Sequence, residues 1–285
     1  MGKSLADPFR GSISFLFLIL NTIFWVGLLL VVALVKLLIP VESWRTTCSR
    51  VSNAIAQSWV GLNSLGLHLT RNIHWDIQGT EGLEPKSWYL LVANHQSMVD
   101  IAVLQKIFHR KAPVLKFFLK RELIWVPFLG AAWWALDFPF MRRMSSTHDL
   151  ATTRRVCDKF KILPVTVMNF VEGTRFTGAK REEQKSPFKN LLKPKAGGIA
   201  VVLGCMGDQL RSILDVTIVY PEGVPGLWKF LSSGSLEIKV RVRQLPIPAE
   251  LMGDYFKDRQ FRQRFNGWLN TLWNEKDHLI ETLKG

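Results

Sequence analysis

The chain has 285 residues, of which 48% are hydrophobic and 21% are charged. This hydrophobic content excludes a disordered protein, and three widely spaced cysteines exclude a small domain held together by disulfides. Its 37 lysines and arginines against 23 acidic residues leave a formal net charge of +14. Such a surplus predicts a polyanionic partner, either nucleic acid or anionic lipid headgroups. The 11 tryptophans favour lipid, because tryptophan is enriched where membrane meets water.

Residues 11–35 contain no charged side chain. A helix needs about 20 apolar residues to cross a bilayer, so this segment predicts an uncleaved membrane anchor. A signal peptide is the competing interpretation, but its apolar region would be about 7–15 residues long and a small-residue cleavage site would follow. A buried helix of a soluble core is the weaker alternative.

A second uncharged stretch, residues 51–70, is more polar. It fits a second span, a helix in the membrane interface, or a helix packed on a globular domain. Basic residues flank the first segment on both sides, so they do not fix its orientation in a membrane. These two basic flanks would also fit a shallow hairpin that dips into one leaflet. We therefore predict membrane-anchoring helices over residues 1–71 and a globular domain over residues 72–285.

The remainder of the chain alternates between strand and helix patterns. Strands are predicted over residues 73–77, 88–93, 114–119, 165–171, 216–220 and 235–243, and helices over residues 98–108, 152–161 and 197–203. Helices between strands indicate the α/β class, with a mixed sheet flanked by helices. Apolar residues at three- and four-residue spacings after residue 260 predict a last helix, packed on the core or lying on the membrane.

Two polar clusters directly follow predicted strands, which is where α/β sheets place their functional loops. The first begins with Asn94 and contains His95 and Asp100. If His95 lies in the loop and Asp100 in the first helical turn, Asp100 can orient the imidazole, which then acts as a general base. Taken alone, this spacing also fits a surface histidine and an aspartate at a helix start.

The second cluster runs from Glu172 to Arg175. Glycine permits a tight turn, and Thr174 and Arg175 suit a phosphate group. A basic pair at Lys120 and Arg121, with further arginines at 142–143, offers another place for an anionic headgroup. Zinc-ligand spacings, Walker loops, dinucleotide-binding glycine motifs and nucleophile elbows do not occur, so neither a metal nor a bound cofactor is expected.

Together these segments resemble the glycerophospholipid acyltransferase family, of the lysophosphatidate acyltransferase type. The order of three blocks and the 77-residue gap between His95 and Glu172 carry the resemblance, which covers roughly residues 88–220. The matching residues are Asn94, His95 and Asp100, then Lys120, Glu122, Leu123, Pro127, Gly130 and Arg143, then Glu172, Gly173, Thr174 and Arg175. Residues 126–130, 170–176 and 268–273 resemble more closely a bacterial branch of the family, typified by the YihG protein. The chain departs from the family pattern at two places. It has Arg142 where the family often has an acid, and it lacks the family's proline at Leu214-Asp215-Val216. Both departures concern the acceptor headgroup.

The resemblance implies that a fatty acyl group passes from acyl-CoA or acyl-carrier protein to the free hydroxyl of a lysophospholipid. The expected acceptor is 1-acyl-sn-glycerol-3-phosphate, which gives phosphatidic acid, and another lysophospholipid is the alternative. It also implies that His95 is the general base, that Asp100 orients it, and that no acyl-enzyme forms. The implied substrate-binding residues are Asn94, Lys120, Arg143, Glu172, Gly173, Thr174 and Arg175.

The expected location is a membrane, the bacterial inner membrane, with the catalytic domain on the cytoplasmic side. The expected partners are the lysophospholipid, the acyl donor and an anionic bilayer, but no nucleic acid. A non-catalytic, membrane-tethered lipid-binding module is the alternative from another functional class. Nucleic-acid binding comes third.

Overall fold

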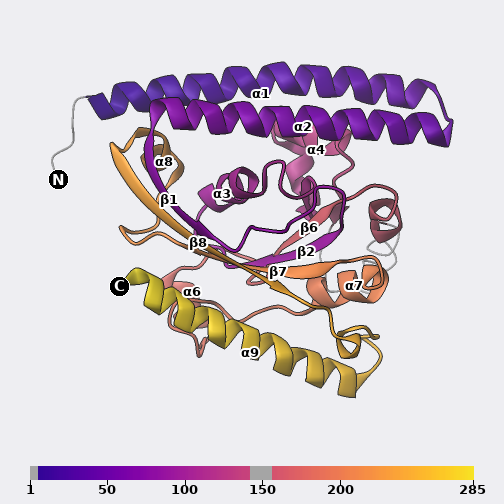
Figure 1. Ribbon diagram of the computed structural model, residues 1–285, viewed down its shortest axis with the longest axis vertical. Helices are drawn as coiled ribbons and strands as arrows, with labels where there is room; N and C mark the ends of the chain where they lie inside the picture. The colour runs from indigo at the N-terminus through magenta and orange to yellow at the C-terminus, as the bar shows by residue number, and fades with distance from the viewer. Residues whose placement is uncertain (1–5, 142–155) are drawn as a thin grey trace.

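The computed structural model describes residues 6–141 and 156–285 (Figure 1). Two long helices, α1 (Ala6–Leu38) and α2 (Glu42–Thr70), form a hairpin along the top of the molecule. A third long helix, α9 (Arg259–Lys284), runs along the bottom, and a sheet lies between them. The predicted α/β class with a mixed, helix-flanked sheet is confirmed.

The central sheet places several chain segments at one edge. Its strands are β1 (Asn72–Gln78), β2 (Tyr89–Ala93), β3 (Leu115–Phe117), β6 (Thr166–Phe170), β7 (Ser212–Val219) and β8 (Ser235–Leu245). They lie in the order β1-β8-β7-β2-β6-β3. Strands β7, β2, β6 and β3 run parallel, whereas β8 is antiparallel to β7 and parallel to β1. The segments that follow β7, β2 and β6 therefore emerge side by side at the carboxyl edge of the sheet.

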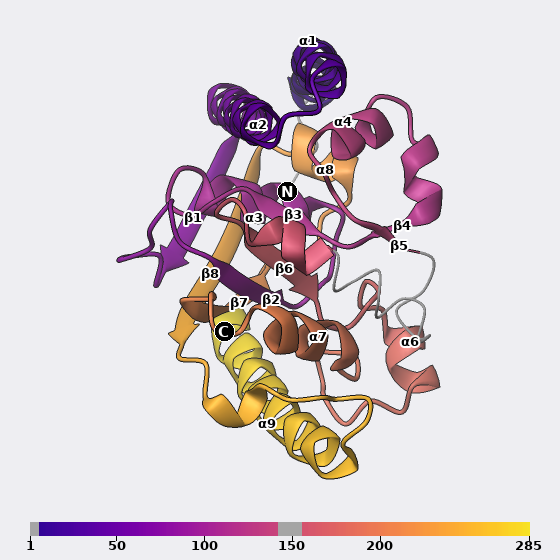
Figure 2. The ribbon, with the colours of Figure 1, turned by 90° about the vertical axis from the view of Figure 1, so that its right-hand side faces the viewer.

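Helices cover both faces of this sheet (Figure 2). The face toward the hairpin packs against α3 (Val99–Phe108) and α8 (Leu227–Ser232). The other face packs against α7 (Gly197–Met206) and α9. The remaining elements are β4 (Leu119–Lys120), η1 (Arg121–Trp125), α4 (Leu129–Ala135), β5 (Phe140–Met141), α6 (Gly178–Glu183) and η2 (Ala249–Leu251).

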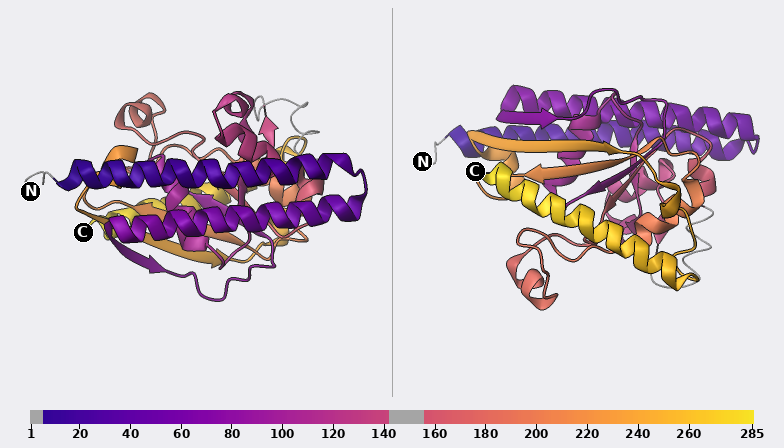
Figure 3. Two further views of the ribbon diagram at one scale, coloured as in Figure 1. Left: turned by 90° about the horizontal axis from the view of Figure 1, so that it is seen from above. Right: turned by 60° about the horizontal axis from the view of Figure 1, so that its bottom comes forward.

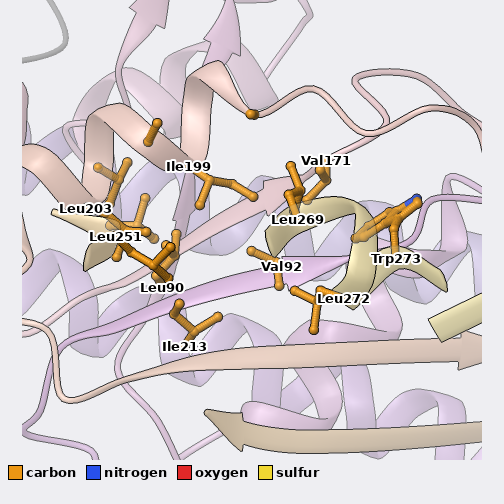
Figure 4. Close-up of a cluster of buried hydrophobic side chains, with 14 of the residues drawn as sticks. Leu90, Val92, Val171, Ile199, Leu203, Ile213, Leu251, Leu269, Leu272 and Trp273 are labelled. Carbon is orange, nitrogen blue, oxygen red and sulfur yellow. The ribbon is translucent and has the colours of Figure 1, made fainter. Parts of the chain in front are cut away.

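The buried faces follow directly from the sequence pattern. Strands β2 and β7 are buried along their whole length because helices cover both sides of them. Strand β8 alternates instead, with every second side chain from Leu236 to Val242 buried. Figure 4 shows the core beneath the sheet, a cluster that includes Leu90 and Val92 of β2 and Leu269 and Trp273 of α9.

The observed elements differ from the predicted ones mainly at their ends. Strand β7 begins at Ser212, four residues before the predicted strand, and residues 114–119 divide into β3 and β4. Of the predicted helix over 152–161, residues 156–160 are helical, and 152–155 lie outside the described residues. The sequence patterns did not predict η1, α4, α6 or α8, which are all short.

Helices α1 and α2 are joined by polar side chains as well as apolar ones. The Ser14 hydroxyl donates to Oγ1 of Thr70 at 2.8 Å, and the Asn21 amide donates to Oδ1 of Asn63 at 2.7 Å. Gly66 allows close approach, because a Cβ there would lie 2.4 Å from the Phe17 ring. The uncharged stretch over 51–70 is therefore the second arm of a hairpin.

Both ends of α1 contact the α/β domain. Near its start, Gly11 packs so closely on α8 that a Cβ would lie 2.6 Å from Cβ of Ser232. Near its end, Nζ of Lys36 lies 2.5 Å from Oδ2 of Asp137, in the segment between α4 and β5. Seen from above, the hairpin accordingly lies along the domain (Figure 3). Among the described residues, one helix, Pro8–Leu38, is long and apolar enough to cross a membrane, with a mean hydropathy of 2.7.

Candidate active site

A histidine and an aspartate meet at the carboxyl edge of the sheet. His95 lies in the loop after β2, and Asp100 lies in the first turn of α3. Residues five apart on one continuous helix would not share a face, but the loop position of His95 brings the pair together. Nδ1 of His95 lies 2.9 Å from Oδ2 of Asp100. This is the contact on which the sequence-based hypothesis of a general base depends.

Asp100 is fully buried and surrounded by donors. The backbone N–H groups of Gln96 and Ser97 donate to Oδ2 at 2.6 and 2.8 Å, and the Tyr220 hydroxyl donates to Oδ1 at 2.6 Å. Burial, and then the neighbouring Asp100, raises the pKa of Tyr220, so its hydroxyl stays protonated. An ionised carboxylate only accepts hydrogen bonds, so Nδ1 of His95 carries a hydrogen and Nε2 is left as the basic nitrogen.

The His95 residue is fixed through both its ring and its backbone. The imidazole stacks on Phe170, with centroids 3.9 Å apart and planes 12° apart. The backbone N–H donates to Oε1 of Glu172 at 2.9 Å, and the carbonyl accepts the N–H of Phe176 at 2.7 Å. The end of β6 and the loop after it therefore position the imidazole, while 16% of the His95 side chain stays exposed.

Glu172 connects two loops beneath the histidine. Its side chain is fully buried, and Oε2 accepts the N–H of Leu192 at 2.8 Å while Oε1 accepts that of His95. Burial raises the pKa of Glu172 to about 7, although the two backbone hydrogen bonds and Lys276 act in the opposite direction. The carboxylate thus belongs to the scaffold that holds the catalytic loop.

The rest of this loop turns toward solvent. Gly173 has a φ of +68°, which glycine adopts without strain, and a Cβ there would lie 3.2 Å from the side chain of Lys195. The Thr174 hydroxyl accepts a hydrogen bond from Nζ of Lys180 at 2.7 Å. The Arg175 side chain is exposed and lines the same cavity as His95.

The other predicted site residues lie in different surroundings. Asn94 is fully buried and uses both ends of its amide on the backbone of Ile218, with two hydrogen bonds of 2.9 Å. It therefore ties the end of β2 to β7. Lys120 is exposed in β4 and does not line the cavity, and Arg143 lies outside the described residues.

A cavity of about 730 Å³ extends from His95 beneath the helical hairpin. Most of its walls are apolar and come from α1, α2, α3 and α4, with Phe17, Leu29, Ala102 and Ala132 among them. Along α1 the lining runs from Ser14 to Leu29, which is about 22 Å at 1.5 Å per residue. One leaflet of a bilayer core is about 15 Å thick, so an entire acyl chain fits this length.

Sequence reasoning did not find Tyr220 or Phe170 as site residues. Both lie at the carboxyl ends of strands that neighbour β2, and that position is the one signal that marks them. Nor could the cavity be predicted, since helices far apart in the chain form it. Among the described residues, His, Cys, Asp and Glu side chains form no group of three that could hold a metal ion.

Comparisons with known proteins identify similar sequences. The model of the Acyltransferase family matches residues 74–223. Lysocardiolipin acyltransferase 1 of Gallus gallus is 22% identical over 81% of this chain and 62% of its own length. The 1-acyl-sn-glycerol-3-phosphate acyltransferase gamma of Mus musculus is 26% identical over 70% of this chain and 54% of its own. The chain thus spans less than two thirds of the length of either relative.

A solved structure shares the fold along the whole chain. The crystal structure of the 1-acyl-sn-glycerophosphate acyltransferase PlsC from Thermotoga maritima superposes with a TM-score of 0.59 at 16% identity. The match covers 100% of this chain and 98% of the other. The likeness therefore includes the helical hairpin as well as the sheet.

Proposed function

Because this chain belongs to the acyltransferase family, we propose that it transfers a fatty acyl group from a thioester to the free hydroxyl of a lysophospholipid. The observation that carries the proposal is the contact between the partly exposed His95 and the buried Asp100 at the mouth of an apolar cavity long enough for an acyl chain. The favoured acceptor is 1-acyl-sn-glycerol-3-phosphate, which would become phosphatidic acid. Within the family, the assignment of this chain to the YihG-type bacterial branch remains a prediction.

In the proposed reaction His95 acts as the general base. Nε2 takes the proton of the acceptor hydroxyl as its oxygen attacks the thioester carbonyl, and Asp100 stabilises the imidazolium that forms. The carbon–sulfur bond then breaks, and the leaving thiolate takes the proton from His95. The product is an ester and a free thiol, without an acyl-enzyme.

The cavity suits the acyl chain of the donor. A lysophospholipid already has its own chain in the bilayer, whereas the chain on a water-soluble carrier needs another apolar environment. Arg175, at the mouth, is placed to attract the phosphate of the acceptor, while Gly173 and Thr174 shape its loop. Lys120 and Arg143 remain proposed contributors to the same headgroup site, and Asn94 and Glu172 act by holding the loops.

Acyl-CoA and acyl-carrier protein are both proposed donors, because each presents the same kind of thioester. Other lysophospholipids are alternative acceptors, since relatives of this chain are named as lysocardiolipin acyltransferases. Purified protein should be offered a panel of lysophospholipids against both donors, with the products read by mass spectrometry. We expect lysophosphatidate to react fastest. A non-catalytic lipid-binding module would instead bind anionic vesicles and acylate no acceptor.

Replacing Tyr220 with phenylalanine should lower the acylation rate about tenfold to a hundredfold, the worth of one hydrogen bond to a charged group. Asp100 would lose a donor and hold the imidazole less firmly, so kcat should fall while KM changes little. Tyr89→Phe is the matched control, because that buried hydroxyl bonds the backbone of Glu84 instead. Equal effects from both variants would contradict a specific role of Tyr220.

We propose that the protein associates with an anionic membrane through one leaflet. Apolar side chains such as Leu16, Phe24 and Val31 are exposed along α1, and both ends of this helix contact the α/β domain. A helix that crossed the bilayer would carry one end away from that domain. The net charge of +14 favours anionic headgroups. The bacterial inner membrane, with the catalytic domain on the cytoplasmic side, is the proposed location.

This arrangement predicts where the turn of the hairpin is accessible. Val41 is 52% exposed between α1 and α2. A Val41→Cys variant without the native cysteines, bound to the outside of anionic vesicles, should react with a membrane-impermeant maleimide. Glu250→Cys, on the α/β domain, is the positive control. Labelling at Glu250→Cys alone, with Val41→Cys protected until the vesicles are opened, would indicate a helix that crosses the bilayer.

A further inference from the structure

Helix α9 contains a lysine with no exposed surface. Its ammonium, on Lys276, forms two hydrogen bonds and one ion pair. Nζ donates to the Val216 carbonyl at 2.6 Å and to Oγ1 of Thr217 at 3.1 Å, and it lies 2.6 Å from Oδ1 of Asp215. Burying an ammonium costs several kcal/mol before its partners offset it. Because of this cost, the buried position of the ammonium beneath the carboxyl ends of the strands indicates that it has a function.

The nearby acidic partner is Glu172, whose charge matters for the catalytic loop. Two backbone N–H groups, from His95 and Leu192, each donate to one of its oxygens. Only an ionised carboxylate offers both oxygens as good acceptors, because a protonated oxygen is itself a donor. If Glu172 took up a proton, one of the two loops would lose its anchor.

Helix α9 reaches Glu172 by two routes. Nζ of Lys276 binds the carbonyl of Val216 and lies 5.4 Å from the centre of the Trp273 ring. Val216 pairs with Ala93 of β2, which pairs in turn with Phe170, two residues before Glu172. From this position the ammonium lowers the pKa of Glu172, and Glu172 raises that of Lys276. In addition, Nε1 of Trp273 donates to the carbonyl of Leu192 at 3.1 Å, on the residue whose N–H binds Glu172. Figure 4 shows Trp273 in the same cluster as Val171, which directly precedes Glu172.

We propose that Lys276 is a positioning residue for the acyl transfer proposed above: its buried ammonium stabilises the negative charge of Glu172 and thereby fixes the backbone of His95. Lys276 touches neither substrate nor the reacting atoms, and it acts through Glu172. The third block of the family resemblance would accordingly depend on a residue more than 100 positions later in the chain.

Other charges around this pair set the design of the test. Asp100 on α3 opposes the ionisation of Glu172, while Lys276 favours it. Arg243 on β8 donates to Oδ2 of Asp215 through two nitrogens, at 2.9 and 2.7 Å. Asp215 therefore keeps a partner when Lys276 is replaced.

The test is the pH dependence of kcat/KM for acyl transfer in Lys276→Met. Without the ammonium, Glu172 takes up a proton at higher pH. The acid limb of the profile should move up by about one pH unit, a tenfold change in proton affinity, and the wild-type rate should return at high pH. Glu275→Gln removes an exposed neighbouring charge, the partner of Arg243, and should leave the limb in place. An unshifted limb in Lys276→Met would overturn the proposal.

Two further measurements keep the proposal testable if Lys276→Met folds poorly or if the protein turns out not to transfer acyl groups. Asp215→Asn/Lys276→Met removes both members of the buried pair, and the limb should still be shifted; a limb restored to its wild-type place would assign the effect to Asp215. The Glu172 carboxyl can also be followed by infrared titration, its band identified by loss in Glu172→Gln. A higher titration midpoint in Lys276→Met supports the proposal even if the wild type acylates nothing, a result that would overturn the proposed function alone. An unchanged midpoint overturns the role of Lys276.

Discussion

Replacing His95 with alanine should lower the rate of acyl transfer about a thousandfold, the usual contribution of a general base. The Asp100 carboxylate would remain, held by Tyr220 and two backbone N–H groups, but no nitrogen would take the proton of the acceptor hydroxyl. The affinity for lysophospholipid should change little, because Arg175 and the cavity are untouched. The measurement is kcat and KM with lysophosphatidate and a thioester donor.

The control for this variant is His278→Ala. That histidine is exposed on α9 and its ring bonds the carbonyl of Asn274, so the rate should stay at the wild-type level. Circular dichroism should show both variants folded, since the His95 ring is not part of the core. Wild-type turnover by His95→Ala would contradict the assignment of the base, whatever the fate of the acyltransferase proposal.

Filling the inner end of the cavity should shorten the acyl chains that the protein accepts. Ala132 lies on α4, beside Leu29 of α1, at the end of the cavity remote from α8. A phenylalanine at position 132 would occupy the space of the terminal carbons of a long chain. We expect the rate with long-chain donors to fall about tenfold or more, while shorter chains keep their rate.

Ala131→Phe is the matched control for this prediction. It makes the same change at the adjacent position of α4, which does not line the cavity. Competition between donors of graded length, with product chains weighed by mass spectrometry, gives the length profile of each variant. Equal losses at all chain lengths in Ala132→Phe would contradict the assignment of the cavity to the acyl chain.

Local patterns predicted much of the fold. Alternation over 235–243 predicted β8, because a strand buried on one face alternates with a period of two. The apolar run at 88–93 predicted β2, because a strand buried on both faces is apolar throughout. Short elements were missed, since they contain too few residues to show a periodic pattern. The turn from η1 into α4, for example, is so tight that a Cβ on Gly130 would lie 2.0 Å from the carbonyl oxygen of Ile124. The conformational propensities of the individual residues do not predict such a contact.

Site residues that lie close together in the sequence could be predicted, whereas those that only the fold brings together could not. His95 and Asp100 are five residues apart, so the spacing allowed their pairing, and the order of the three blocks favoured it. Tyr220 reaches Asp100 across 120 residues, and only strand order brings them together. Lys276 stands between Glu275 and Asp277, where a charged helical face is normally in solvent. Position 276 continues the three- and four-residue spacing of the buried side chains of α9, but the acceptors on β7 that make a buried lysine possible could not be predicted.

The most direct test of the central claim is product formation by the purified full-length protein. Lysophosphatidate in anionic vesicles is mixed with a donor whose acyl group carries an isotope label, and the lipids are analysed by mass spectrometry. The account predicts phosphatidic acid with the label in its new ester and one free thiol released per ester, with this signal absent in His95→Ala. Tight vesicle binding without transfer of the label to any lysophospholipid, from either acyl-CoA or acyl-carrier protein, would contradict it.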